Sequence, residues 1–187
     1  MLSPSSPART AGTFNAISNL LPREVTEMER LGIPADALAG PTPVKASYIV
    51  FDNGGFEFEH HHKHGVEGVR AFLFLVSDSL GLARDVVAWA PQMNRLATWL
   101  GLAWALGEEL AYRPRLSDGL PVWRSPVEWL RARRDGLCLV RSHVAAHYLD
   151  CAGPLLAEDA AHGAELRQLL TRPAPRILIP SSSRKTA

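Results

Sequence analysis

The chain has 187 residues, of which 47% are apolar and 21% are charged, and its 20 basic and 19 acidic side chains leave a formal net charge of +1. These values indicate one folded domain or two small subdomains, and they exclude a wholly disordered chain. No apolar run approaches the roughly 20 residues that cross a bilayer, so we expect a soluble protein with no membrane partner.

The cysteine content and the first residues favour a reducing compartment. Only Cys138 and Cys151 are present, and a core at this chain length needs neither a disulfide nor a structural metal. The initial segment MLSPSSPARTAGT has a single Arg and no apolar stretch, which is not typical of a secretory signal. We therefore expect a cytoplasmic location.

The sequence predicts an α+β fold in three parts, with disordered tails over residues 1–13 and 181–187. The first part is a helical N-terminal arm over residues 14–40, because apolar residues from Phe14 to Leu31 recur at helical spacing. Pro22 is expected to begin a second helix and Gly32 to follow its end. The Gly-Pro-Thr-Pro stretch then breaks the chain before the next element.

The second part is an antiparallel β subdomain over residues 44–110. Residues 46–51 (ASYIVF) and the FEFEH run flank an Asp-Asn-Gly-Gly turn, which predicts a hairpin, and residues 71–76 and 83–89 predict a second one. Residues 96–100 and 102–106 flank Gly101 and are candidates for a third pair. Trp89, Trp99 and Trp104 are expected on the buried face of this sheet.

The third part, residues 120–180, alternates strand and helix in the order β-α-β-α-β-α. Ser125, Pro126 and Glu128 form a capping box with Pro at the first helical position, and Gly136 is expected to end that helix. This alternation predicts a small parallel sheet covered by helices. The strands are expected at residues 122–124, 137–140, 155–157 and 176–179.

Arginine is concentrated between residues 113 and 135, where six arginines stand against three carboxylates. Guanidinium groups match phosphate geometry, so a basic face here is a candidate contact for nucleic acid. The alternative is a solvated helix surface on which Arg131 pairs with Glu128. The candidate nucleic-acid-binding residues are Arg115, Arg124, Arg131, Arg133 and Arg134.

A histidine cluster and an acidic pair are the candidates for a divalent metal site. On a strand, His60 and His62 would point to one face, and imidazole binds borderline metals. Glu158 and Asp159 follow a predicted parallel strand, where α/β folds hold Mg²⁺ or catalytic acids. The alternatives are a solvated loop for the histidines and a helix N-terminus for the carboxylates. The full candidate metal set is His60, His62, His64, Glu158 and Asp159.

The order of elements is similar to that of Toprim-containing primases and their relatives. That family has a Glu-Gly after its first Toprim strand and an Asp-x-Asp, followed by Gly, after its third. The matching stretches here are Trp-Arg-Ser at 123–125 and Glu-Asp-Ala at 158–160, with Gly163 following, so one carboxylate is replaced by Arg and another by Ala. Over residues 121–170, the similarity implies a degenerate domain that binds without catalysis.

The sequence favours a non-enzymatic accessory or binding protein, with nucleic acid as the most concrete partner. No G-x-G-x-x-G motif, P-loop or nucleophile signature surrounds the candidate nucleophiles Ser125, Ser142 and Cys138, and no cofactor is predicted. One alternative is an enzyme that uses a divalent metal at the set above. Another is a protein-protein adaptor or self-associating protein that uses Phe14, Ile17 and Leu21 on an amphipathic arm.

Overall fold

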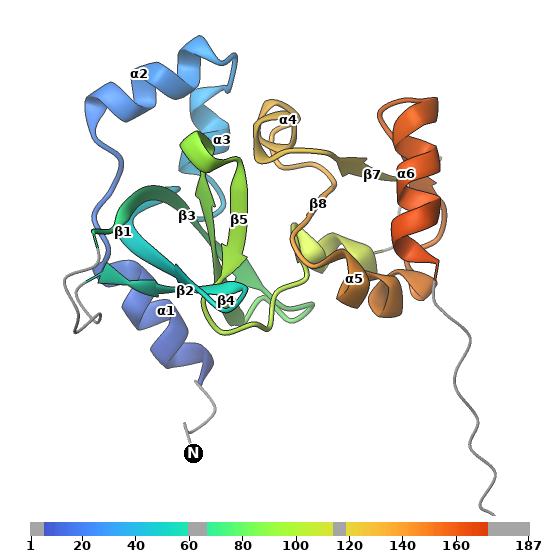
Figure 1. The fold of residues 1–187 in the computed structure, drawn as a ribbon, viewed down its shortest axis with the longest axis horizontal. Coiled ribbons are helices and arrows are strands. Elements are labelled where there is room, and N and C mark those ends of the chain that lie inside the picture. The colour runs from blue at the N-terminus through green and yellow to red at the C-terminus, as the bar shows by residue number, and fades with distance from the viewer. Residues whose placement is uncertain (1–5, 60–66, 114–118, 172–187) are drawn as a thin grey trace, which may run out of the picture.

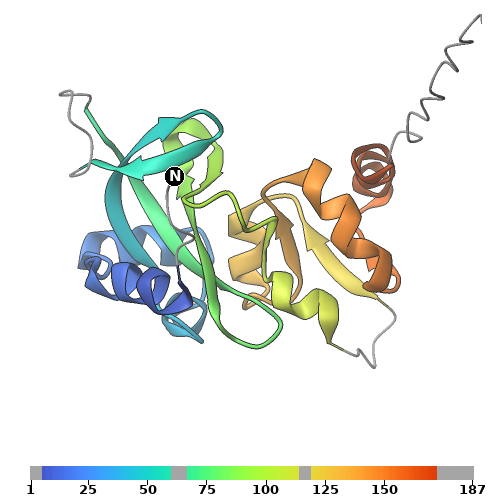
Figure 2. The ribbon, with the colours of Figure 1, turned by 90° about the horizontal axis from the view of Figure 1, so that it is seen from below.

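The computed structural model describes residues 6–59, 67–113 and 119–171. It has an α+β architecture of N-terminal helices, a closed five-stranded β-barrel and a C-terminal mixed sheet with helices. The barrel and the C-terminal sheet lie side by side, as Figure 1 and the perpendicular view in Figure 2 show. Within the described ranges, no helix is long and apolar enough to cross a membrane.

The N-terminal arm consists of the helices α1 (Pro7–Ala16), α2 (Pro22–Arg30) and α3 (Ala35–Ala39). Helix α1 begins inside the segment that the sequence analysis predicts as a tail, so that prediction was wrong for residues 7–13. Ser6 caps the helix by accepting a hydrogen bond from the Arg9 amide, and Pro7 occupies the first turn. Phe14, which is 1% exposed, anchors the helix on the barrel.

The barrel is formed by β1 (Lys45–Asp52), β2 (Gly55–Phe58), β3 (Val69–Ser77), β4 (Ala83–Ala90) and β5 (Arg95–Thr98), in the order β1-β2-β5-β4-β3. Both predicted hairpins, β1–β2 and β3–β4, are confirmed. The expected antiparallel sheet is instead a closed mixed barrel, because β2 and β5 pair in parallel at Gly55 and Thr98. A Cβ atom at Gly55 would lie 3.0 Å from the Thr98 carbonyl oxygen, so glycine permits this closure.

The expected third hairpin around Gly101 is wrong. Strand β5 pairs with β4, whereas β6 (Ala105–Leu106) belongs to the C-terminal sheet. The fully buried Asp85 carboxylate accepts hydrogen bonds from the amides of Leu100, Leu102 and Ala103. This carboxylate fixes the segment as a connection between the two sheets, so the β subdomain ends before residue 110.

The predicted alternation of strands and helices is confirmed in the C-terminal unit. Strands β7 (Leu120–Trp123), β8 (Leu137–Leu139) and β9 (Leu155–Leu156) alternate with helices α4 (Pro126–Arg131), α5 (Ser142–Tyr148) and α6 (Ala160–Leu170). The order is β6-β8-β7-β9, with β7 parallel to β8 and β9 and with β6 antiparallel to β8. The sheet is therefore mixed, not all parallel. The predicted strand at 176–179 lies outside the described residues.

Helix α4 ends at Arg131, five residues before the predicted end at Gly136. Arg133 and Arg134 have φ values of 55° and 63°, so the backbone has already left the right-handed helical region. Three short 3₁₀ helices complete the described elements: η2 (Pro91–Met93), η3 (Glu108–Tyr112) and η4 (Leu149–Cys151).

Three apolar clusters make up the core, and the predicted tryptophan face is divided among them. Trp99 packs beside the barrel interior with Phe14 and Phe58. Trp89 lies on the outer face of the barrel, where α2, α3 and α4 cover it. Trp104 belongs to the core of the C-terminal sheet. The barrel is thus packed on both faces, which explains why period-two patterning alone did not reveal its closure.

Candidate functional site

The arginines around α4 attach the C-terminal unit to the N-terminal arm. The Arg134 guanidinium donates to the carbonyl oxygens of Ala37 (2.7 Å) and Thr42 (2.9 Å). Arg133 forms an ion pair with Asp36 of α3. Burial lowers the pKa of Arg134 to about 10, which leaves the group charged near neutral pH. These contacts join α3 to α4 and the residues after it, and the two helices are neighbours in the fold.

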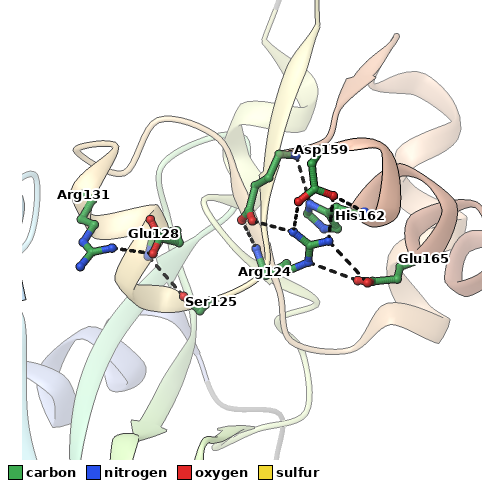
Figure 3. Close-up of polar contacts among 8 residues, drawn as sticks. Arg124, Ser125, Glu128, Arg131, Asp159, His162 and Glu165 are labelled. Carbon is green, nitrogen blue, oxygen red and sulfur yellow. Dashed lines mark hydrogen bonds and ion pairs between the residues drawn. The ribbon is translucent and has the colours of Figure 1, made fainter.

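Arg131 is held in a similar way. Its Nε donates to the Leu31 carbonyl oxygen at 2.7 Å, and its Nη1 lies 2.7 Å from Glu128. The expected pair of Arg131 and Glu128 is present, and Figure 3 shows it beside Ser125. The solvated helix surface of the same interpretation does not extend to Arg134, whose guanidinium donates to two backbone carbonyl oxygens. Ser125 accepts a hydrogen bond from the Glu128 amide, as the capping box predicts.

Arg124, at the carboxyl end of β7, is surrounded by three carboxylates (Figure 3). Its guanidinium lies 3.1 Å from Glu158, 2.9 Å from Asp159 and 3.3 Å from Glu165. The hydrogen bond from Arg124, together with that from the His162 amide, holds the pKa of Asp159 far below its usual range. The Asp159 hydrogen bond also raises the pKa of Arg124. This cluster ties β7 to the start of α6 and leaves Arg124 no unpaired positive charge.

Of the candidate metal ligands, only the two carboxylates lie within the described residues. His60, His62 and His64 lie outside the described residues, as does Arg115. Glu158 and Asp159 are engaged by Arg124, and Asp159 also caps α6 by accepting from the His162 amide at 2.7 Å. Within the described ranges, no group of three or more His, Cys, Asp or Glu side chains is placed to hold a metal ion.

The candidate adaptor face is packed against the chain's own barrel. Phe14 is buried in the barrel cluster and Ile17 packs beside it, while Leu21 is 41% exposed. The Lys45 ammonium, on β1, donates to the carbonyl oxygens of Asn15 and Ile17, at 2.8 and 2.7 Å. These bonds satisfy the carboxyl end of α1 and fix the arm on the barrel.

The candidate nucleophiles are not activated in this structure. Cys138 is fully buried, and burial raises the pKa of its thiol to about 12, so it is not a thiolate at neutral pH. Ser125 serves as the cap of α4. In the part of the chain that the structure describes, no serine hydroxyl forms a hydrogen bond with an imidazole that could act as its base.

A buried ion pair that the sequence analysis missed joins the barrel to the C-terminal unit. The fully buried Glu108 carboxylate accepts from Arg84 of β4 at 2.9 Å and from the Trp104 amide at 3.0 Å. Burial raises the pKa of Glu108, although these donors oppose the shift. Only the fold reveals this partnership, because 24 residues separate Arg84 from Glu108.

A cleft of about 560 Å³ lies where the barrel meets the C-terminal unit. Its three walls come from segments that are distant in sequence: the β1–β2 turn, the end of β5, and the junction between β8 and α5. It is lined by Asp52, Asn53, Gly54, Gly55, Phe56, Glu57, Thr98, Trp99, Leu100, Gly101, Val140, Arg141, Ser142 and His143.

The cleft presents charges of both signs. Asp52 and Glu57 are exposed on the hairpin wall, and the partly buried Arg141 is on the other wall with Ser142. Arg141 also donates a hydrogen bond to the Gly101 carbonyl oxygen, which holds the guanidinium against the connection between the sheets. A small molecule with an anionic and a cationic group would find a complementary charge on each side.

No pattern in the sequence predicts this cleft. The sequence pattern places Asp52 in a turn, whereas it is the last residue of β1 and pairs with Gly55. Ser142 is the first residue of α5, and Arg141 occupies the cap position before it. Arg141, the nearest cation to that helix start, is an isolated arginine outside the arginine-rich window. The place of Arg141 in the cleft depends on its hydrogen bond to Gly101, which is 40 residues away in the sequence and cannot be predicted from a local pattern.

Comparisons with protein-family models, curated proteins and solved structures found no match. The similarity to Toprim-containing primases therefore has no support beyond the order of elements and the residues that match its motifs.

Proposed function

We propose that this chain is a non-enzymatic binding protein and that the cleft between the barrel and the C-terminal unit is its ligand site. The observation that supports the proposal is the set of charged groups in that cleft. Arg141 lies on one wall and Asp52 and Glu57 on another, with Trp99 as an apolar surface. The volume of about 560 Å³ lies within the range of small-molecule sites.

The charge pattern favours a small zwitterionic ligand such as an amino acid or a short peptide. A ligand carboxylate would accept hydrogen bonds from Arg141, and charge-assisted bonds of this kind are stronger than neutral ones. A ligand ammonium would lie near Asp52 and Glu57. The hydroxyl groups of Thr98 and Ser142 add hydrogen-bonding capacity.

The test is a thermal-shift screen of the full-length protein against free amino acids and dipeptides at millimolar concentration, followed by calorimetry on each compound that stabilises it. We expect saturable binding that Arg141→Gln reduces at least about tenfold, which corresponds to the loss of one charge-assisted bond. The matched control is Arg23→Gln, an exposed arginine on α2 outside the cleft. Failure of every compound to bind, or equal binding by R141Q, would contradict the proposal.

A nucleic-acid contact is the second candidate function, and the exposure of two arginines favours it. The Arg131 and Arg133 side chains are 44% and 66% exposed, and their partners Glu128 and Asp36 are 39% and 59% exposed. Exposed ion pairs contribute little to stability, so a phosphate can compete for these guanidinium groups. This candidate is tested by fluorescence anisotropy of labelled DNA and RNA at low and moderate salt. Salt-dependent binding that Arg131→Ala and Arg133→Ala weaken would support it, and no binding at low salt would remove it.

A further inference from the structure

An apolar groove runs between β9 and one side of α6. Its volume is about 770 Å³, and Leu155, Leu166 and Leu170 supply its main apolar surface. Helix α6 contributes the small residues Ala160 and Gly163 to the same groove, which allow close approach to the helix. Strand β9 is the last strand in the order β6-β8-β7-β9, and within residues 6–59, 67–113 and 119–171 it pairs with β7 alone.

The end of α6 lies at the beginning of β9. Leu170 and Thr171, the last residues of the described chain, line the same groove as Leu155, the first residue of β9. In a strand-helix-strand unit, the helix returns the chain to the edge from which the preceding strand began. The chain therefore leaves α6 at the position where a further parallel strand would begin.

The sequence after this point has the length and the residues that the groove requires. Four residues, RPAP at 172–175, precede the apolar run RILI at 176–179. Four residues are a usual length for the connection from a helix to the next strand, and fully extended they span up to about 14 Å. Pro180 follows the run and limits any further ladder pairing.

We propose that residues 176–179 of this chain occupy the groove as an added parallel strand on the free edge of β9. The added strand would protect that edge from pairing with another chain. Its isoleucines would cover apolar surface on β9 and α6, namely Leu155, Leu166 and Leu170. The occupant is thus the chain itself, and not a second copy or a foreign strand.

The test is amide hydrogen exchange of the full-length protein, measured by NMR at the residues of β9. We expect slow exchange at Leu155 and acceleration of at least about tenfold in the double variant Ile177→Asp, Ile179→Asp, because a buried charge is incompatible with the apolar groove. The matched control is Ser181→Asp, Ser183→Asp, which adds the same charge beyond the run. This control should leave exchange at Leu155 unchanged.

Three results would overturn the proposal. Fast exchange at Leu155 in the natural sequence would show that the edge is open. Equal acceleration by the control variant would show that added charge, and not the loss of the isoleucines, is responsible. Protection that rises with protein concentration, together with dimers in sedimentation velocity, would show that a second copy occupies the groove.

Discussion

The barrel and the C-terminal sheet differ in whether they have edge strands. The barrel closes on itself, since β2 reaches β5 at Gly55 and each strand has a partner on both sides. The C-terminal sheet has two terminal strands, β6 and β9, each of only two residues. Closure removes exposed edges, whereas an open sheet must cover or shorten them. Closure therefore leaves the barrel without an exposed edge, whereas the C-terminal sheet keeps a short strand at each end.

The polar contacts differ in the same way. In the barrel and at its contact with the C-terminal unit, the Asp85 and Glu108 carboxylates are buried and accept hydrogen bonds. In the C-terminal unit, the Arg124 cluster is exposed, and the carboxylates that surround it exceed its charge. Buried charges are costly to leave unpaired, while exposed pairs contribute little. Substitutions should consequently have large effects near the barrel and small effects around Arg124.

The largest effect is expected from Phe14→Ala, which removes the side chain that α1 places against the barrel interior. Truncation of a buried phenylalanine costs about 3–5 kcal/mol in the free energy of unfolding. Urea denaturation followed by circular dichroism measures this loss. Leu21→Ala, at a half-exposed position on the same arm, should cost less than about 1 kcal/mol. Similar losses for both variants would show that the arm is not docked on the barrel.

A second large effect is expected at Gly107, which precedes the buried Glu108. Its φ is 73°, and a Cβ atom there would lie 2.3 Å from the Gly136 carbonyl oxygen. Gly107→Ala should therefore destabilise the protein by at least about 2 kcal/mol, because both the backbone conformation and the contact oppose a side chain.

The matched control is Gly12→Ala in α1, where a Cβ atom would meet no heavy atom within 4 Å. That variant should stabilise the protein by about 0.5–1 kcal/mol through higher helix propensity. Thermal denaturation compares the two variants, and destabilisation of equal size by both would contradict the close packing at Gly107.

An intermediate effect is expected at Glu24, which links α2 to β3. Burial acts to raise the pKa of Glu24, but the hydrogen bonds from Arg70 and the Leu21 amide outweigh it and leave the pKa below its ordinary value of 4.5. A carboxyl group with a lowered folded-state pKa stabilises the fold above the unfolded-state pKa, and this contribution is lost as the pH falls. Stability should therefore fall below about pH 4.5.

Glu24→Gln should cost about 1–2 kcal/mol at neutral pH and flatten the decline in stability at acidic pH. Chemical denaturation between pH 3 and pH 7 is the measurement. Glu27→Gln, an exposed change on the same helix, is the control. An unchanged pH dependence in E24Q would remove the role assigned to the Glu24–Arg70 pair.

The smallest effect is expected from Arg124→Gln. The substitution leaves Glu158, Asp159 and Glu165 without their shared cation, so the melting temperature should fall slightly at low salt. Added salt should restore most of the loss, because screening weakens repulsion among exposed carboxylates. Differential scanning calorimetry at two ionic strengths tests this. A large loss that salt does not reverse would show that Arg124 has a packing role comparable with that of the barrel charges.

Local sequence patterns predicted the elements better than their assembly. The turn at Asp52–Gly55 and the Ser125 cap could be predicted from the sequence, because the residues that form each of them are only a few positions apart. The closure at Gly55 and Thr98 was not, since it depends on the distance between two strands. The charge excess of the arginine window was visible in the sequence. The partners of Arg133 and Arg134, namely Asp36 and two backbone carbonyl oxygens, are apparent only in the tertiary structure.

The most direct test of the central claim is an NMR titration of the isotopically labelled full-length protein with free amino acids and dipeptides. The account predicts saturable shifts at the amides of Gly54, Gly101 and Ser142, one on each wall of the cleft, and their loss in Arg141→Gln. Shifts confined to the surface of α4, or no saturable shift at any amide, would contradict the assignment of the cleft as the ligand site.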